Sequence, residues 1–283
     1  MSSLTAYESS SARDSGSPAA SNPGLCIFRT DIKAIEVSDG TTYLRYNYDS
    51  ISYADVINNL SLELDGSDDH LDCGNDSGLN LTNGFSINCY VKQDDSGINT
   101  IIQRRTGSNG YQIGIESGAF KYNGGVLRTF GTGYTSTTDW YMLTVTHTGG
   151  TNGTLKGYVN GSLVNTLTDT YTSIPTANFY IGKNYAGDLY SHHGYVDEVG
   201  VWSSVLSAST ISDIYNNGNG PVDISVTSNL VGYWRMGDGS GDTDSGSGTP
   251  AAGDTVGTVK NLANPGTHDG TGSGGALYSS TTP

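Results

Sequence analysis

The sequence predicts an all-β protein in which two antiparallel sheets form a sandwich that carries one short helix. β-Prone runs recur roughly every ten to fifteen residues, separated by turns rich in Gly, Asn and Asp. The composition agrees with strands and turns, because 283 residues include 40 glycines and 19 tyrosines and only 14% are charged. Long helical patterns are missing, and the length suits one large β domain with appended segments.

The main domain is expected over residues 51–222. Its strand-like runs alternate polar and apolar side chains, as a half-buried strand requires. Asn160-Gly161 predicts a two-residue hairpin turn, since both residue types readily adopt positive φ. The predicted runs fall at residues 62–74, 85–92, 140–146, 155–164, 179–184 and 194–202.

One short helix is expected directly after the run 194–202. Ser207 is a natural N-cap, because its hydroxyl can accept from free backbone N–H groups at a helix start. Ile211, Ile214 and Tyr215 fall on one face at helical spacing. Gly218 can take the left-handed conformation that ends the helix.

The order of these motifs resembles the laminin G-like, concanavalin A-like jelly rolls of lectins and glucanases. The resemblance rests on the opening turn 65–70, the strand 85–92 and the closing run 194–202 followed by the capped helix. The chain departs from the usual pattern at Glu63-Leu64, where Ser-Phe is common, and at His70, which occupies an aromatic position. Cys89-Tyr90 likewise replaces Ala-Trp. The resemblance implies a jelly-roll sandwich.

The N-terminal region is expected to contain two parts, a flexible arm over residues 1–24 and a β-hairpin anchoring segment over residues 25–50. Asp39-Gly40 is a strong hairpin signal. A lone hairpin is marginal in water, so this segment is expected to pack on a partner, on its own copies or on the main domain. It resembles a short segment that recurs in structural proteins of tailed bacteriophages, especially of marine and cyanobacterial hosts. The assembly residues expected from this view are Phe28, Ile35, Val37 and Tyr43.

Residues 223–283 are expected to form a C-terminal strand and a Gly/Ser/Asp-rich arm. The run 229–239 resembles the first strand of another copy of the family, but the copy stops there. A truncated repeat cannot close its own core, so we expect it to pack on the sandwich edge or on a neighbouring subunit. Trp234 is accordingly predicted as an assembly residue.

Charge and cysteine usage restrict the partners. With 28 acidic and 13 basic residues the formal net charge is −15, which argues against nucleic acid or an anionic membrane as a partner. The N-terminal residues lack the apolar core of a signal peptide, and no run approaches the ~20 apolar residues of a membrane span. The three cysteines are expected to be reduced, and a Cys73–Cys89 bridge remains open if their strands are adjacent.

No enzymatic activity is expected. Glycoside hydrolases need two carboxylates that flank the scissile bond, and the E-x-D-x-x-E arrangement of related glucanases is absent. Asp197 and Glu198 are neighbours on a strand, so they are expected to face opposite sides and not to reach one substrate. We therefore predict no catalytic residues.

Two binding sites are considered. No cofactor is required, but calcium could be held by Asp65, Asp68, Asp69 and Asp197 if the turn and the strand meet; alternatively these groups cap their own turns. A glycan site is expected in the loop that follows residue 184, where aromatic, carboxylate and imidazole groups are mixed. Its candidate residues are Tyr185, Asp188, Tyr190 and His192; alternatively the tyrosines cover the sandwich edge or a subunit contact.

The function expected from these patterns is that of a virion structural protein of a tailed phage, as capsid decoration, fibre or tail component, displaying a lectin-like jelly roll. Host-surface glycan adhesion is an additional role. Its partners would be other virion proteins, bound through the N-terminal segment, and its own copies in a homo-oligomer, with a trimer by analogy. Localisation would be the virion, after synthesis in the host cytoplasm. A freestanding carbohydrate-binding module and a polysaccharide hydrolase are the two alternatives.

Overall fold

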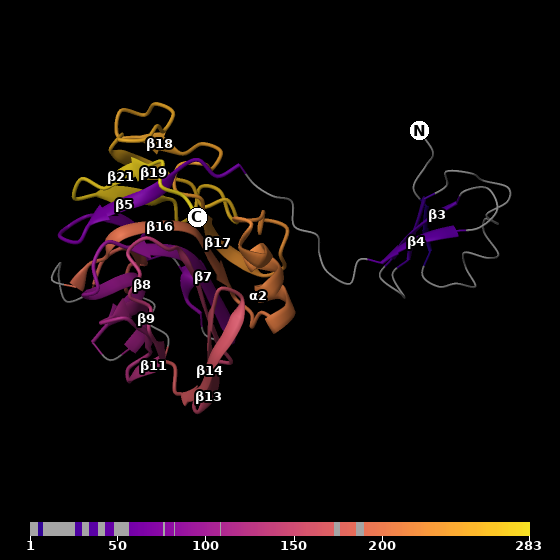
Figure 1. Ribbon diagram of the computed structural model, residues 1–283, viewed down its shortest axis with the longest axis horizontal. Coiled ribbons are helices and arrows are strands. Elements are labelled where there is room, and N and C mark those ends of the chain that lie inside the picture. Colours follow the sequence, from indigo (N-terminus) through magenta and orange to yellow (C-terminus); the bar gives the residue numbers. More distant parts are fainter. Residues whose placement is uncertain are drawn as a thin grey trace. The chain divides into compact units, whose positions relative to one another are not determined.

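The computed structural model (Figure 1) describes residues 57–75, 77–81, 83–107, 109–172, 176–184 and 190–283, and the backbone of four strands nearer the N-terminus. The chain forms two compact units, Met1–Ser52 and Tyr53–Pro283.

The first unit contains a four-stranded sheet in the order β1-β2-β3-β4. Strands β2 (Cys26–Arg29), β3 (Ala34–Ser38) and β4 (Tyr43–Asn47) are antiparallel neighbours and coincide with the three predicted runs. Strand β1 (Thr5–Tyr7) pairs with β2 in parallel, so the arm predicted to be flexible contains a strand. The expected assembly positions 28, 35, 37 and 43 lie on these strands, and their side chains lie outside the described residues.

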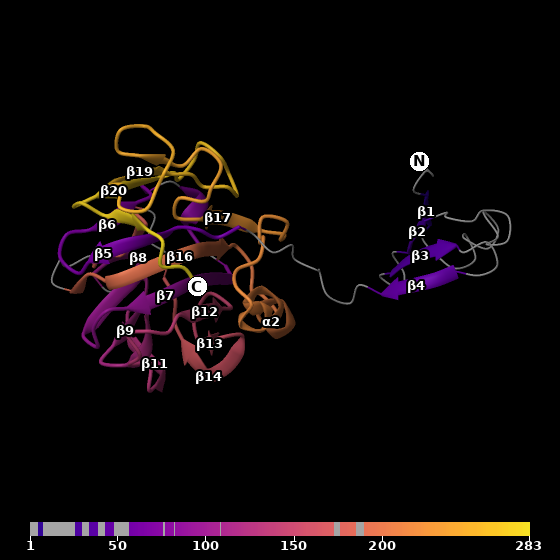
Figure 2. The same ribbon diagram turned by 45° about the horizontal axis from the view of Figure 1, so that its top comes forward.

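The second unit is a sandwich of two antiparallel sheets within the described residues (Figure 2), which confirms the predicted fold class. The nine-stranded sheet has the order β11 (Leu127–Thr132), β10 (Ala119–Asn123), β9 (Asn109–Glu116), β8 (Ile98–Thr106), β15 (Tyr180–Ile181), β6 (His70–Asp72), β20 (Gly270–Ser273), β19 (Val256–Val259) and β18 (Thr243–Asp244). The eight-stranded sheet has the order β14 (Ser162–Asp169), β13 (Gly153–Val159), β12 (Tyr141–His147), β7 (Phe85–Gln93), β16 (His193–Trp202), β5 (Ser61–Asp65) and β21 (Leu277–Ser279), and β17 (Leu230–Trp234) pairs with β16.

The main core lies between the two sheets and follows the alternation of the strands. In β7, for example, Phe85, Ile87, Cys89 and Val91 all belong to this core. Cys73 and Cys89 are buried free thiols, so the alternative of a bridge between them is wrong. Cys73 follows β6 and Cys89 lies in β7, and these strands belong to different sheets, so the adjacency that the bridge required is not met.

Helix α2 (Ala208–Tyr215) covers the outer face of the eight-stranded sheet over a second, smaller core that includes Ile211 and Ile214. Its N-cap is the predicted one, because the Ser207 hydroxyl accepts from the backbone N–H of Thr210. Its end differs from the prediction, since Asn216 at φ 52 takes the left-handed position and Gly218 is the last residue of the 3₁₀ turn Asn216–Gly218 that follows. No helix of the described part of the chain is long and apolar enough to cross a membrane.

The predicted C-terminal strand is present as β17, which pairs with β16. The rest of the segment is not an arm, because it supplies strands β18 to β21 to the two sheets. Strand β20 pairs with β6 and β21 with β5, and Figure 1 shows the yellow β21 beside the purple β5. Strand β20 lies so close to β6 that a Cβ at Gly270 would come within 2.3 Å of the Leu71 side chain. Trp234 is fully buried, stacks on Phe179 at 5.2 Å and donates from Nε1 to the carbonyl of His268 at 2.9 Å. Its predicted assembly role is therefore wrong, since it anchors this segment inside its own sandwich.

Candidate functional site

A β-bulge in β16 brings Asp197 and Glu198 to the same face of the eight-stranded sheet. Asp197 lies opposite Tyr90 and Gly200 opposite Asn88, so β16 has one residue more than β7 between these pairs. Glu198 takes φ 48, which breaks the alternation of the strand. The expectation that the two carboxylates face opposite sides is therefore wrong.

Both carboxylates are buried and already bonded. Glu198 accepts from Arg235 Nε at 2.9 Å and from the Tyr233 hydroxyl. Asp197 accepts from Asn58 Nδ2 at 3.0 Å and from the backbone N–H of Glu198 at 2.8 Å. Burial and the neighbouring Glu198 raise the pKa of Asp197, and burial raises that of Glu198 against the opposing charge of Arg235. These contacts indicate a structural pair. That the chain has no enzymatic activity stays a prediction.

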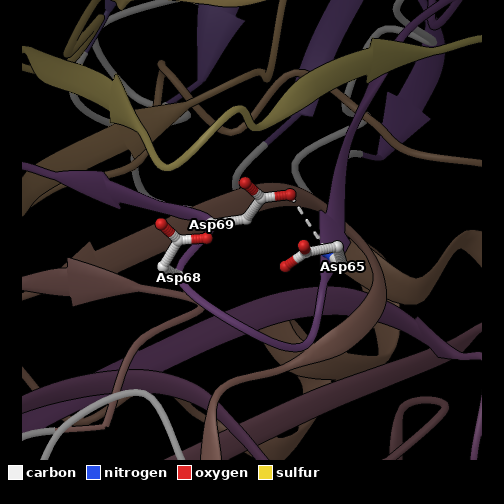
Figure 3. A group of neighbouring side chains, drawn as sticks. All are labelled: Asp65, Asp68 and Asp69. Carbon is white, nitrogen blue, oxygen red and sulfur yellow. Dashed lines mark hydrogen bonds between the residues drawn. The ribbon is translucent and has the colours of Figure 1, made fainter.

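Three of the four predicted calcium ligands do come together at the turn between β5 and β6 (Figure 3). Asp65, Asp68 and Asp69 each place a carboxylate oxygen within 4.8 Å of the others, and we call this group the aspartate turn. Asp69 also accepts from the backbone N–H of Asp65 at 3.0 Å, and Asp65 accepts from that of Ser67 at 2.8 Å. Burial raises the pKa of Asp69, with the charges of Asp65 and Asp68 adding to the effect. Oxygen donors of this kind fit a hard cation, with water completing its six to eight ligands.

Asp197 does not belong to this group. In the pairing of β16 with β5 the residue opposite Asp65 is His193, and Asp197 lies four positions further along β16. Its carboxylate oxygens face the N–H donors described above. Its prediction as a fourth ligand is therefore wrong.

The predicted glycan loop is only partly described. Tyr185 and Asp188 lie outside the described residues, whereas Tyr190 is 38% exposed. His192 is completely buried, with Nδ1 3.1 Å from Asn99 Oδ1 and Nε2 3.3 Å from the Tyr195 carbonyl. Burial lowers its pKa to about 4, although the bond to the Tyr195 carbonyl opposes this shift. A surface glycan contact by His192 is therefore wrong, and the neutral imidazole links β16 to β8.

A larger hollow, of about 700 Å³, opens on the outer face of the nine-stranded sheet over β6 and β20. Here Asp72 accepts twice from Asn178 Nδ2, at 3.0 Å to each oxygen, and once from the backbone N–H of Gly74 at 2.9 Å. Lys260 binds the second carboxylate, that of Asp269, at 2.8 Å. We call this hollow the β6–β20 groove; its polar lining residues are His70, Asp72, Asn75, Asn178, His268, Asp269, Thr271 and Ser273.

Tyr180 borders this groove, as the cross-strand neighbour of Asp72. Its ring packs edge-on against His70 with 5.5 Å between centroids, and Lys183 Nζ lies 5.7 Å from its centre. Since Leu71 and Ile181 point into the core, the alternation of β6 and β15 directs Asp72 and Tyr180 outward. An aromatic ring thus stands beside carboxylate, amide and imidazole groups.

The groove is one end of a row of residues that crosses every strand of the nine-stranded sheet. Because directly paired residues share a face, these side chains all lie on the outer face. With strands about 4.8 Å apart, the row spans roughly 38 Å. From β11 to β18 it consists of Leu127, Asn123, Gln112, Gln103, Tyr180, Asp72, Thr271, Thr258 and Thr243.

A second hollow, of about 260 Å³, lies at the other end of this row. It contains Tyr190, the described and exposed member of the predicted glycan set, with Asn184, Arg105, Gln112 and Glu116 around it. We call it the Tyr190 hollow. Between the two ends, Gln103 is buried and its Oε1 has no hydrogen-bond partner among the described residues.

The family model of the concanavalin A-like lectin/glucanases superfamily matches residues 65–212, just over half of the chain. The chain belongs to this superfamily. The laminin G-like part of the predicted resemblance is therefore confirmed. No curated protein matches the chain in sequence.

Several solved structures resemble this chain at low sequence identity. A protein from Bacteroides ovatus that is inferred to bind carbohydrate has 17% identity and a TM-score of 0.56, over 92% of this chain and 70% of its own. Domain 4 of an extracellular arabinanase from Geobacillus stearothermophilus, solved with arabinotriose, has 21% identity and a TM-score of 0.44, over 59% of this chain and 82% of its own. A heptameric pentraxin from Limulus polyphemus has 16% identity and a TM-score of 0.45, over 56% and 82%. At these identities the likeness concerns the fold alone.

Proposed function

We propose that this protein binds carbohydrate in the β6–β20 groove. The observation that carries the proposal is the convergence of carboxylate, amide, imidazole and hydroxyl groups in a hollow of about 700 Å³, beside the ring of Tyr180. Sugar hydroxyls both donate and accept hydrogen bonds, and this lining offers both kinds of partner. Ligand sites in proteins are typically concave and use a few convergent polar groups in this way. The carbohydrate binding inferred for the similar Bacteroides ovatus protein supports the same reading.

The charges in the groove favour a neutral sugar. Asp72 is satisfied by Asn178 and Gly74, and Asp269 is paired with Lys260, so no cation is left over to select an acidic sugar. The net charge of −15 would also repel a polyanion.

Binding is tested by titrating the full-length protein with neutral polysaccharides and their oligosaccharides, by calorimetry or on a glycan array. Thr271→Arg places a bulky side chain at an exposed position of the groove. It should weaken binding at least roughly tenfold, because the larger side chain displaces the polar contacts between the sugar and the groove. Thr132→Arg, at an exposed position of β11, is the matched control and should bind as the wild type does. The proposal fails if no saccharide binds, or if both variants bind equally.

At the finer level we propose that the lectin-like unit is displayed on a phage virion and attached through residues 1–52. The supporting observation is that these residues form a compact unit with a sheet of their own, separate from the sandwich. Light scattering of the full chain and of a chain that starts at Ile51 tests this. An oligomer that becomes a monomer supports assembly through the first unit. Monomers in both cases contradict it and favour a freestanding carbohydrate-binding module, while release of reducing sugars would indicate a hydrolase.

A further inference from the structure

A third hollow, of about 290 Å³, lies on the outer face of the opposite, eight-stranded sheet, between β12, β13 and the start of α2. No carboxylate lines it, although the chain has 28 acidic residues. We call it the threonine hollow; its lining residues are Thr146, Thr148, Thr154, Lys156, Tyr158, Val205, Leu206, Ser207 and Ala208. Its chemistry thus differs from that of the β6–β20 groove, which contains two carboxylates.

Lys156 is the positive charge of this hollow. Within the described residues it has neither an ion pair nor an aromatic partner. The other four lysines described there do have one: Lys121 with Glu116, Lys260 with Asp269, Lys92 over Tyr195 and Lys183 over Tyr180. Lys156 is thus an ammonium group whose charge no carboxylate neutralises within the described part of the chain, so it can pair with an anionic ligand.

Thr146 adds a hydroxyl that makes no hydrogen bond among the described residues. Its side chain is 2% exposed and lines the hollow, and no hydrogen bond to its hydroxyl is made within the described part of the chain. Its neighbours differ, since the Thr144 hydroxyl donates to Asn88 Oδ1 at 2.6 Å and Thr148 Oγ1 accepts from the Thr154 N–H at 2.8 Å. Because this hydroxyl belongs to a residue that lines the hollow and is not used within the described part of the protein, it can donate to a ligand oxygen.

The first turn of α2 supplies further donors. Ser207 caps the N–H of Thr210 at 3.1 Å, which leaves the N–H groups of Ala208 and Ser209 without a hydrogen bond among the described residues. Ala208 itself lines the hollow. The first N–H groups of a helix carry partial positive charge and favour anions.

We propose that the threonine hollow binds one oxyanion group, a sulfate or a phosphate. Lys156 supplies the charge, the Thr146 hydroxyl donates a hydrogen bond, and the start of α2 contributes backbone donors. A neutral sugar fits less well, because the hollow has no carboxylate or side-chain amide to accept from its hydroxyls. This site is independent of the carbohydrate proposal, since it lies on the other sheet and uses different residues.

The test is a titration of the full-length protein with sodium sulfate and with sodium phosphate, followed by the amide NMR signals of Ala208 and Ser209. Sodium chloride at equal ionic strength is the reference. Lys156→Gln should weaken binding at least roughly tenfold and Thr146→Val roughly three- to tenfold, because each removes a hydrogen bond to a charged ligand. Lys121→Gln, which removes a paired lysine of the other sheet, should leave the affinity unchanged. Circular dichroism confirms that the variants remain folded.

The source of the anion is separated by a second set of titrations, with a monosulfated sugar, which is not a polyanion, and its unsulfated form. Shifts that require the sulfate esters identify a sulfated glycan as the ligand, and shifts with the inorganic ions alone identify a free ion. Either result supports the site if the shifts are lost in the Lys156→Gln variant. The proposal is overturned if neither ion moves the two amide signals beyond the chloride reference, or if Lys156→Gln binds as tightly as the wild type.

Discussion

Replacing Arg235 with methionine should strongly destabilise the second unit, because its guanidinium joins three segments. It donates from Nε to Glu198 at 2.9 Å, from one Nη to the carbonyl of Asp238 at 3.3 Å and from the other to that of Ile57 at 2.6 Å. The Arg235 side chain is 13% exposed and that of Glu198 is 3% exposed. The pair is therefore shielded from water on the Glu198 side.

The magnitude follows from the unpaired charge that Arg235→Met leaves behind. Breaking a buried ion pair by removal of one partner costs about 3–5 kcal/mol, against about 5–15 kcal/mol for the whole unfolding of a typical domain. For a unit of this size we expect the Tm to fall by about 6–20 °C. Arg235 now opposes the upward pKa shift of Glu198, so its removal should raise that pKa further. The double variant Glu198→Gln, Arg235→Met should regain most of the loss, because the unpaired charge of Glu198 is then gone as well.

Urea unfolding of the wild type, both single variants and the double variant at pH 7 gives the coupling energy. Lys121→Met is the matched control, since its pair with Glu116 at 2.8 Å is more exposed and should contribute about 0–1 kcal/mol. A coupling below about 0.5 kcal/mol between Glu198 and Arg235 would show that the two act independently and would refute the reasoning.

Three further predictions concern other parts of the second unit. Unfolded His192 takes up a proton near pH 6.5 and the folded residue only near pH 4, so stability should be lost as the pH falls through this window, by up to about 3 kcal/mol. In urea unfolding, His192→Gln should flatten this dependence of the free energy of unfolding on pH. Parallel plots of that free energy against pH for the wild type and the variant would contradict the prediction. If calcium binds the aspartate turn, calcium chloride should raise the Tm of the wild type but not that of Asp68→Asn. An equal Tm response of the two proteins would contradict calcium binding and would show that hydrogen bonds alone stabilise the turn. Burial raises the pKa of the Cys89 thiol to about 12 and that of Cys73 as well, so neither should react with a thiol reagent in native Cys26→Ser protein, and rapid native labelling would count against the structure.

The features that the sequence predicted correctly are those with local signals. The Ser207 cap needs a hydroxyl three residues before the N–H it bonds, and the Asn160-Gly161 hairpin needs two residues that accept positive φ, which are observed at 49° and 74°. The C-terminal strands after β17 had no such signal. Strand β18 has only two residues and β20 is Gly-Thr-Gly-Ser, so neither shows the alternation by which a strand is recognised.

The same distinction holds for the sites. The aspartate turn was predicted because its three carboxylates are nearly contiguous. The β6–β20 groove was missed because it combines residues 70–75, residue 178 and residues 266–273, which only the pairing of β20 with β6 brings together. The bulge at Glu198 was missed because positive φ at a glutamate has no signature in the sequence.

The position of β20 makes the proposed ligand site dependent on the C-terminal segment. This strand forms one wall of the groove, and the segment is held in place by the buried Trp234 and by the Arg235–Glu198 pair. A ligand that binds only the folded protein stabilises it by about 2.7 kcal/mol at 100 times its Kd. Saturating sugar should therefore offset much of the loss caused by Arg235→Met, while it should not stabilise Thr271→Arg, whose groove is blocked. Stability measured with and without sugar thus separates a variant that has lost its fold from one that has lost its site.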